Sequence, residues 1–238
     1  MIKIAITGAN GRMGQSIVQE ALAQSGNFQL VSALVRKGSS LPENTIIPFE
    51  EDPAVAFSQA DVIIDFTAPQ ATLQWVETAI TLQKPIVIGT TGFSPEENLA
   101  IKEAATKIPL LLAPNTSLGI AVMHQLVREA TKKLGPDYAI EIIDFHHEFK
   151  KDKPSGTALA LENTILENGR KSVPIFSIRG GETIGEHEVM FTSAKERLAI
   201  SHEALDRSLF AEGALKAAAW LKDQKPGLYS MQDVLGLS

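Results

Sequence analysis

A short apolar run that leads directly into a spaced series of glycines constrains the fold of this chain more than any other feature. The run Ile2–Thr7 is followed by Gly8-Ala-Asn-Gly-Arg-Met-Gly14 and then by an amphipathic segment. A buried strand, a glycine turn and a helix start in this order are typical of dinucleotide-binding units. Gly8 would allow the tight turn, Gly11 would let backbone N–H groups approach a pyrophosphate, and Gly14 would let the helix pack close to the strand. Because the spacing is G-x-x-G-x-x-G rather than G-x-G-x-x-G, a glycine turn without a ligand stays open as the alternative.

The rest of the first half alternates short, almost continuous apolar runs with helical patterns. Such runs suit the strands of a parallel sheet that is buried on both faces. Strands are predicted at 28–35, 61–67, 85–89 and 109–113. Helices are predicted over 15–22, over 69–82 and from Ser94 onward. The alternation predicts an α/β fold with a Rossmann-like, doubly wound parallel sheet, in which ligands bind beyond the carboxyl ends of the strands.

The pattern changes near residue 116, and the second half is typical of an α+β domain. Helices are predicted over 117–134, 155–167 and 206–222. Strands are predicted at 138–145, 175–179, 186–192 and 197–204. The last three of these strands can pair antiparallel, so we expect a second, mixed sheet here.

Composition narrows the classes of function. The chain has 238 residues, no cysteine and a formal net charge of −6 at pH 7. Without cysteine, disulfides and thiolate chemistry are excluded, which fits a cytoplasmic protein. The negative charge argues against general nucleic-acid binding, so an anionic ligand would need a local cluster of cations. No apolar window approaches the length of a membrane span, and the first residues lack the pattern of a signal peptide, so we expect neither.

Chemically suggestive residues concentrate in one segment of the second half. There His146 and His147 end a predicted strand, a lysine cluster follows, and Pro154-Ser-Gly-Thr157 opens a helix. The N–H groups and hydroxyls of such a helix start can hold a carboxylate or a phosphate. If the strand continued through Lys150, His146 and Lys150 would share one face of it. A histidine and a lysine near an anion-binding helix start suit proton donation to a substrate that carries carboxylates.

Two other interpretations of this segment stay open. The paired histidines could ligate a metal, but neighbours on a strand point apart and no third ligand is evident, so we expect no metal. The lysines could lie on a solvated loop, as most lysine clusters do. The remaining histidines lack such company and are interpreted as structural or surface residues; they are His124, His187 and His202.

Together these motifs resemble the 4-hydroxy-tetrahydrodipicolinate reductase family, also called dihydrodipicolinate reductases, over nearly the whole chain. The resemblance rests on Gly8–Gly14, Asp65–Thr67, Gly89–Phe93, Ala113–Ser117, Glu141–Thr157 and Asp233–Leu235. It implies an oxidoreductase that uses NADPH or NADH to reduce a cyclic, unsaturated dicarboxylate on the diaminopimelate route to lysine. The agreement of so many motifs in order and spacing argues against the solvated-loop interpretation.

The resemblance also implies roles for single residues. His146 resembles the general acid that protonates a substrate carbon, and Lys150 its partner proton donor and electrostatic stabiliser. The residues that resemble substrate contacts are His147, Ser155, Gly156 and Thr157. The residues that resemble cofactor contacts are Gly8, Ala9, Asn10, Gly11, Arg12, Met13, Phe66, Gly89, Thr90, Thr91, Ala113, Pro114, Asn115 and Thr116.

One departure from the family pattern bears on the cofactor. Many members have an acidic residue at the end of the second strand, where this chain has Val35 followed by Arg36 and Lys37. Losing the acid removes repulsion against a 2′-phosphate, and the cations can pair with one. We expect NADPH to be preferred, with Arg36 as the main contact; the alternative is that both cofactors work and the cations are surface residues.

The resemblance also concerns domains and assembly. It implies a dinucleotide-binding domain at 1–116, a substrate-binding and oligomerisation domain at 117–205, and a segment 206–238 that returns to the first domain. A homotetramer is the usual assembly of the family, although the segment Val173–Glu186 is shorter here than in longer members.

Two other functions remain as alternatives. The chain could be a dinucleotide-binding sensor without catalysis, but a sensor has no need for two proton donors beside a carboxylate site. It could also be an oxidoreductase of the same architecture that acts on a sugar or an aldehyde acid. The carboxylate-binding pattern favours a dicarboxylate substrate.

Overall fold

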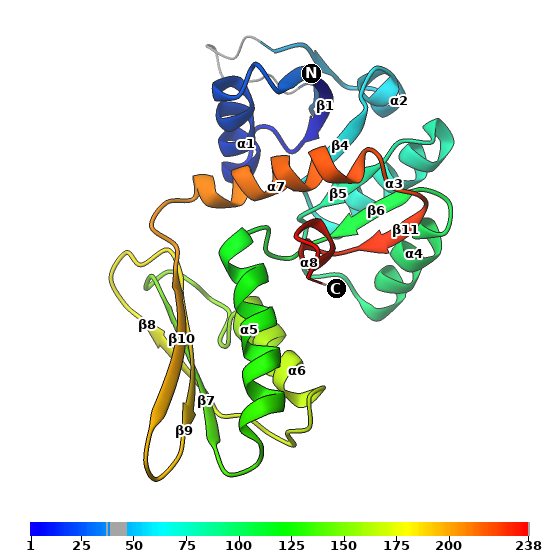
Figure 1. The fold of residues 1–238 in the computed structure, drawn as a ribbon. Helices are drawn as coiled ribbons and strands as arrows, with labels where there is room; N and C mark the ends of the chain where they lie inside the picture. Colours follow the sequence, from blue (N-terminus) through cyan, green and yellow to red (C-terminus); the bar gives the residue numbers. More distant parts are fainter. Residues whose placement is uncertain (37, 39–46, 238) are drawn as a thin grey trace. The chain divides into compact units, whose positions relative to one another are not determined.

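The chain forms two compact units. The computed structural model describes residues 1–36, 38 and 47–237. One unit comprises Met1–Thr116 together with Ser208–Gly236, and the other comprises Ser117–Arg207. Each is described separately below, with the elements labelled as in Figure 1.

The first unit is built on a seven-stranded sheet in the order β11-β6-β5-β4-β1-β2-β3, and its described strands all pair parallel with their neighbours. Its strands are β1 (Ile2–Thr7), β2 (Phe28–Leu34), β3 (Phe49–Glu50), β4 (Val62–Asp65), β5 (Ile86–Ile88), β6 (Pro109–Leu112) and β11 (Gly227–Tyr229). The strand order reverses direction between β1 and β4, which is the position of the ligand crevice in doubly wound folds.

Helices cover the sheet of the first unit. They are α1 (Arg12–Ala23), α2 (Pro53–Ser58), α3 (Pro69–Leu82), α4 (Pro95–Ala105), α7 (Ser208–Leu221) and α8 (Met231–Val234). α7 packs on α1 and on the central strands β4, β5 and β6 (Figure 1). Residues of α2, α3 and α4 form a buried cluster with strand residues such as Ile63 and Ile88. All four residues of β4 are buried, which shows that both faces of this strand are covered. Strands covered on both faces have almost continuous apolar sequences.

Local sequence signals explain where several helices begin. Pro69 and Pro95 occupy the first turns of α3 and α4, where a missing N–H costs nothing. Ser94 and Glu97 form a reciprocal capping box at α4, an arrangement that stabilises a helix by about 1 kcal/mol. The Ser117 hydroxyl accepts from the N–H of Ile120 and so caps α5. These signals were all visible in the sequence.

The second unit pairs a four-stranded mixed sheet with two helices. The sheet order is β10-β9-β7-β8, in which β7 and β8 are parallel and the other pairs antiparallel. The strands are β7 (Ala139–His146), β8 (Ile175–Arg179), β9 (Glu186–Thr192) and β10 (Arg197–Glu203), and the helices are α5 (Leu118–Leu134) and α6 (Gly156–Leu166). The helices and the inward side chains of the strands, including Val189 and Phe191, form one buried core.

The predicted fold class is confirmed: a Rossmann-like parallel sheet is joined to an α+β unit with a mixed sheet. Sequence analysis did not predict β3, α2, β11 or α8, because these elements are too short to show a clear period. Lys37, one of the two predicted cofactor cations, lies outside the described residues. Among the described helices, none has both the length and the apolar character that a bilayer crossing requires.

The α5 residue His124 leads to a prediction about acid stability. Burial, followed by the charge of Arg128, lowers the pKa of His124 to about 4. The unfolded chain therefore takes up a proton between pH 6.5 and 4 that the folded chain does not, so stability falls as the pH drops through this range. At pH 5 the loss from this histidine is about 2 kcal/mol.

Urea unfolding at pH 7.5 and pH 5.0 tests this expectation. His124→Asn keeps a polar partner for Thr164, whose hydroxyl lies 2.8 Å from Nδ1 of His124. We expect the variant to be less stable at pH 7.5 but to lose about 2 kcal/mol less than the parent on acidification. An equal loss in both proteins would contradict the prediction.

Candidate active site

The carboxyl ends of the parallel strands in the first unit lie in one row. Thr7 of β1 pairs with Leu34 of β2 on one side and with Asp65 of β4 on the other. Asp65 in turn pairs with Ile88 of β5, which pairs with Leu112 of β6. The loops that follow these five residues therefore emerge from the same edge of the sheet, and they contain the cofactor contacts expected from the sequence apart from Arg12 and Met13, which begin α1.

Two glycines of the first loop and the start of α1 lie too close to other backbone atoms to carry a side chain. Gly8 has a left-handed φ of +70°, and a Cβ there would lie 2.5 Å from the carbonyl oxygen of Phe66. A Cβ on Gly14 would lie 2.1 Å from the carbonyl oxygen of Gly8, so only glycine lets α1 pack this closely on the turn. Gly11 is the N-cap of α1 and offers no side chain to its first turn. A helix start without a side-chain cap suits an anion such as a pyrophosphate.

Phe66 and Gly89 form a second close approach at the same edge. A Cβ on Gly89 would lie 2.1 Å from the ring of Phe66. The side chain of residue 89 is therefore replaced by the Phe66 ring, which joins the loop after β4 to the loop after β5. Thr90 is buried, whereas Thr91 is exposed.

Asp65, the last residue of β4, joins these loops through hydrogen bonds. Its carboxylate is completely buried and accepts hydrogen bonds from the hydroxyls of Thr67 at 2.6 Å, Thr72 at 2.5 Å, Thr90 at 2.8 Å and Thr7. The Thr90 hydroxyl also accepts from the N–H of Thr67 at 2.9 Å. Four hydroxyl donors satisfy a charge that would otherwise be costly to bury. Sequence analysis included Asp65 in a motif but assigned it no role.

The other expected cofactor residues lie at this edge with varied exposure. Arg36 lies two residues after the end of β2 and is exposed, as is Arg12 at the start of α1. Ala113 and Thr116 are buried, and the Thr116 hydroxyl donates to the carbonyl of Phe210 at 2.7 Å. Of the remaining residues, Ala9, Asn10, Pro114 and Asn115 belong to the loops just described, and Met13 lies in the first turn of α1.

In the second unit, β7 ends at His146. The strand does not continue through Lys150, because residues 147–150 form a turn. His146 and Lys150 therefore do not share one face of a strand. The N–H of His147 donates to the carbonyl of Thr183 at 2.7 Å, which holds the turn against the chain before β9. The Nζ of Lys150 lies 2.9 Å from the Asp152 carboxylate. Burial acts to raise the pKa of Asp152, but the bond from Lys150 holds it below its ordinary value.

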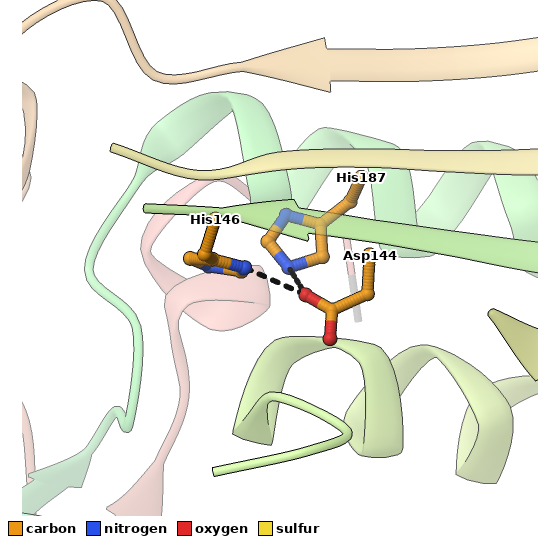
Figure 2. Close-up of side chains that lie close together, drawn as sticks. All are labelled: Asp144, His146 and His187. Atoms are coloured by element: carbon orange, nitrogen blue, oxygen red, sulfur yellow. Dashed lines mark ion pairs between the residues drawn. The ribbon is translucent and has the colours of Figure 1, made fainter. Parts of the chain in front are cut away.

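Asp144 lies two residues before His146 in the chain, and its carboxylate lies beside two imidazole rings (Figure 2). Its side chain is 0 % exposed, and its Oδ1 lies 2.7 Å from Nδ1 of His146. Its Oδ2 accepts hydrogen bonds from three donors: the N–H of Ser155 at 2.9 Å, the hydroxyl of Ser177 at 3.0 Å and the guanidinium of Arg179 at 3.0 Å. Burial acts to raise the pKa of Asp144, but contacts from His146, Ser155 and Arg179 hold it well below its ordinary range.

His187 corrects the sequence-based interpretation of the isolated histidines. It was expected to lack catalytic company, but β9 places it beside Asp144 and His146 (Figure 2). Its Nε2 lies 3.6 Å from the Asp144 carboxylate, and its ring packs edge-on to His146 with centroids 5.1 Å apart. Burial, and next the charge of His146, lowers the pKa of His187 to about 4, so this ring is neutral at pH 7. The alternation in Glu186–Thr192, with histidine, valine and phenylalanine inward, was the signal that could have found it.

The start of α6 lies directly beside this cluster. The Ser155 hydroxyl caps the helix by accepting from the N–H of Ala158 at 3.2 Å, and it lies 3.1 Å from Nε2 of His187. The hydroxyl of Ser155 is therefore engaged within the protein, and so is its backbone N–H, which donates to Asp144. Gly156, at the first position of α6, is exposed, and Thr157 is half-buried. The first turn of α6 thus presents backbone N–H groups where the sequence predicted an anion site.

The cluster also has the composition of a metal site. Ligand atoms of Asp144, His146 and His187 all lie within 4.8 Å of one another, a grouping that the separate positions in sequence did not reveal. However, Arg179 already supplies a positive charge 3.0 Å from the carboxylate, with a side chain that is 5 % exposed. A cation bound here would be repelled by that guanidinium. The arrangement is that of a carboxylate positioned between two imidazoles and an arginine.

Comparison with known proteins gives a consistent result over the whole length. The family model "Dihydrodipicolinate reductase, N-terminus" matches residues 2–116, and "Dihydrodipicolinate reductase, C-terminus" matches residues 119–235. Proteins named 4-hydroxy-tetrahydrodipicolinate reductase from Hahella chejuensis and Geotalea daltonii are 41% and 38% identical, and each alignment covers 100% of both chains. The Zymomonas mobilis protein of that name is 42% identical over 99% of this chain and 98% of its own.

Solved structures show the same fold. A dipicolinate-bound dihydrodipicolinate reductase from Paenisporosarcina sp. TG-14 matches with a TM-score of 0.84 and 24% identity, covering 98% of each chain. A scyllo-inositol dehydrogenase from Lactobacillus casei, solved with NAD(H) and scyllo-inositol, matches with a TM-score of 0.62 and 14% identity, covering 99% of this chain and 93% of that one. The fold is thus shared with dehydrogenases of other substrates.

Proposed function

Because the chain belongs to the dihydrodipicolinate reductase family, we propose that it reduces 4-hydroxy-tetrahydrodipicolinate, by way of dihydrodipicolinate, to tetrahydrodipicolinate in lysine biosynthesis. The observation that carries this function is the match over the full length to reductases of that name at about 40% identity. The enzyme is an oxidoreductase that uses a nicotinamide dinucleotide. Its lack of cysteine fits a cytoplasmic location, which is part of the proposal.

The first unit suits a dinucleotide on structural grounds. The close approaches at Gly8 and Gly14 leave the first turn of α1 open, and the N-cap Gly11 provides no side chain to fill it. The loops after β4, β5 and β6 would hold the nicotinamide and its ribose, with Thr90 fixed by the Asp65 network and the Phe66 ring packed against Gly89. When bound, the reduced nicotinamide supplies a hydride.

The second unit suits the dicarboxylate. Backbone N–H groups of Gly156 and Thr157 at the start of α6 would receive one substrate carboxylate. His147, on the turn after β7, would contact the substrate as well. His146 would give the proton that the reduced ring needs, and Lys150 would stabilise negative charge as it develops. The Asp152 carboxylate lies 2.9 Å from Nζ of Lys150 and holds this ammonium beside the segment.

A coupled spectrophotometric assay tests the function. The substrate is generated from aspartate semialdehyde and pyruvate by a synthase, and the protein is then added with NADPH or NADH. Oxidation of the dinucleotide that depends on the synthase product supports the proposal. Tight dinucleotide binding without such oxidation would contradict it and would favour a sensor or a reductase of another substrate.

The proposed proton donors give a mutational prediction. We expect His146→Gln and Lys150→Ala each to lower kcat by about 100-fold, because each removes a proton-transfer or charge-stabilising group. The Kd for the dinucleotide should stay within about twofold, since neither residue lies in the first unit. Lys151→Ala is the matched control, as it removes the adjacent exposed lysine. A variant that keeps its kcat would remove that residue from the mechanism.

Arg36 gives a prediction about cofactor choice. We propose that NADPH is preferred because the exposed Arg36 can pair with a 2′-phosphate and Val35 presents no acid to repel it. Arg36→Ala should raise KM for NADPH about tenfold, the value of one hydrogen bond to a charged group, and leave KM for NADH within twofold.

Steady-state kinetics with both cofactors decide this question. The control is Lys107→Ala, which removes an exposed cation just before β6, at the opposite end of the strands. Equal or better efficiency of the parent with NADH would overturn the proposed preference. An equal rise in KM for both cofactors would show that Arg36 does not contact the 2′-phosphate.

The open face of the second sheet supports a homotetramer. Phe176 and Ile178 of β8 point away from the helices and are 55% and 49% exposed. We propose that this face is covered by a second copy of the chain. Light scattering should give a mass four times that of the chain, and Phe176→Lys should yield a smaller species, because a buried charge is costly. Leu126→Lys, on the helical side, should leave the mass unchanged. A monomeric parent would contradict the proposal.

A further inference from the structure

We propose that Asp144 is a positioning residue of this reaction: it holds the Nδ1 edge of His146 inward, so that Nε2 is the atom that exchanges the proton with the substrate. The same carboxylate fixes the start of α6, where the substrate carboxylate is to bind. This inference rests on the proposed function, which assigns the proton transfer to His146, and it adds a residue to which the sequence-based analysis assigned no role.

The orientation of His146 is determined from two sides. Its Nδ1 lies 2.7 Å from the Asp144 carboxylate and is completely buried, so the 7 % of the residue that remains exposed belongs to other atoms. On the opposite edge, a Cβ on Gly185 would lie 2.9 Å from Nε2. Gly185 has no left-handed φ, so its backbone does not require glycine. The missing side chain instead leaves room for the Nε2 edge of the ring.

The contact with Asp144 selects one tautomer. Two lone pairs at 2.7 Å would repel each other, so this contact favours the tautomer with its proton on Nδ1. In the neutral ring, Nε2 then carries the lone pair that receives a proton, and in the charged ring it carries the proton to be given. Asp144 therefore decides which nitrogen serves the substrate, as the aspartate of a serine-protease triad does for its histidine.

The second oxygen of Asp144 makes the carboxylate hard to replace. Three donors converge on Oδ2, from Ser155, Ser177 and Arg179. An asparagine at this position must place its carbonyl oxygen there, because an amide NH2 would face three donors. Its NH2 group would then point toward Nδ1 of His146. That ring could accept the hydrogen bond only as the other tautomer, with the proton moved to Nε2.

The same oxygen couples the proton donor to the substrate-binding segment. The N–H of Ser155 donates to Oδ2, and the next two residues begin α6. Arg179 donates to Oδ2 and also to the carbonyl of Asp152 at 2.5 Å, two residues after Lys150. His187 closes the cluster, since its Nε2 lies 3.1 Å from the Ser155 hydroxyl and 3.6 Å from Oδ1. One carboxylate thus sets the relative positions of three proposed functional groups.

The experiment uses the full-length protein with 15N-labelled histidine and its Asp144→Asn variant. NMR at alkaline pH reports which ring nitrogen of His146 carries the proton, with His146→Gln identifying the signals. We expect the proton on Nδ1 in the parent and on Nε2 in the variant. The kcat should fall by about 100-fold, with the KM for the dinucleotide within twofold. Asp144→Glu, which keeps the carboxylate, should restore the parent tautomer and most of the kcat.

His124→Asn is the matched control, because it changes another buried polar residue of the same unit that has no contact with Asp144. It should leave the tautomer and kcat as in the parent. A parent spectrum with the proton on Nε2 would overturn the proposal even if Asp144→Asn did not fold. So would a variant that changes tautomer and keeps its kcat. The tautomer is measured without substrate, so failure of the proposed reaction in the coupled assay is a separate result.

Discussion

The candidate active site depends on one buried, charged carboxylate, that of Asp144. Its contacts reach the start of α6 and the strands β7, β8 and β9. Asp144 lies inside the second unit with no exposed surface, so its charge must be met by donors. These donors come from β8 and from the start of α6, while the two imidazoles come from β7 and β9. Each contact therefore also locates an element of the site. Removing the carboxylate would leave Arg179 without its anionic partner and His146 without a fixed orientation.

The first unit uses the same device. Asp65 is also completely buried at the carboxyl end of a strand, and four threonine hydroxyls satisfy it in place of an arginine. Hydroxyls add no charge of their own, so the network meets the carboxylate without a cation among its donors Thr7, Thr67, Thr72 and Thr90. The loops are further joined by the Phe66 ring over Gly89. In both units, a buried acid at the end of a strand or two residues before it orders the loops that follow.

Sequence patterns predicted most of the fold because its signals are local. The glycine turn, the prolines in the first turns of α3 and α4, and the serine caps of α5 and α6 all act within one helical turn. The bounds of β8 and β9 are also those predicted from the sequence, 175–179 and 186–192. Patterns of this kind carry no information about which distant segments meet. The neighbours of Asp144 come from three strands, so neither Arg179 nor His187 could be placed beside it from sequence.

A crystal structure of the protein with NADPH and dipicolinate, a planar cyclic dicarboxylate, would test the proposed roles of His146 and Asp144 most directly. We expect one carboxylate of the ligand on the N–H groups of Gly156 and Thr157, and Nε2 of His146 facing the ligand ring while Nδ1 stays on Asp144. A dicarboxylate bound away from the start of α6, or a His146 ring turned so that Nδ1 faces the ligand, would contradict it.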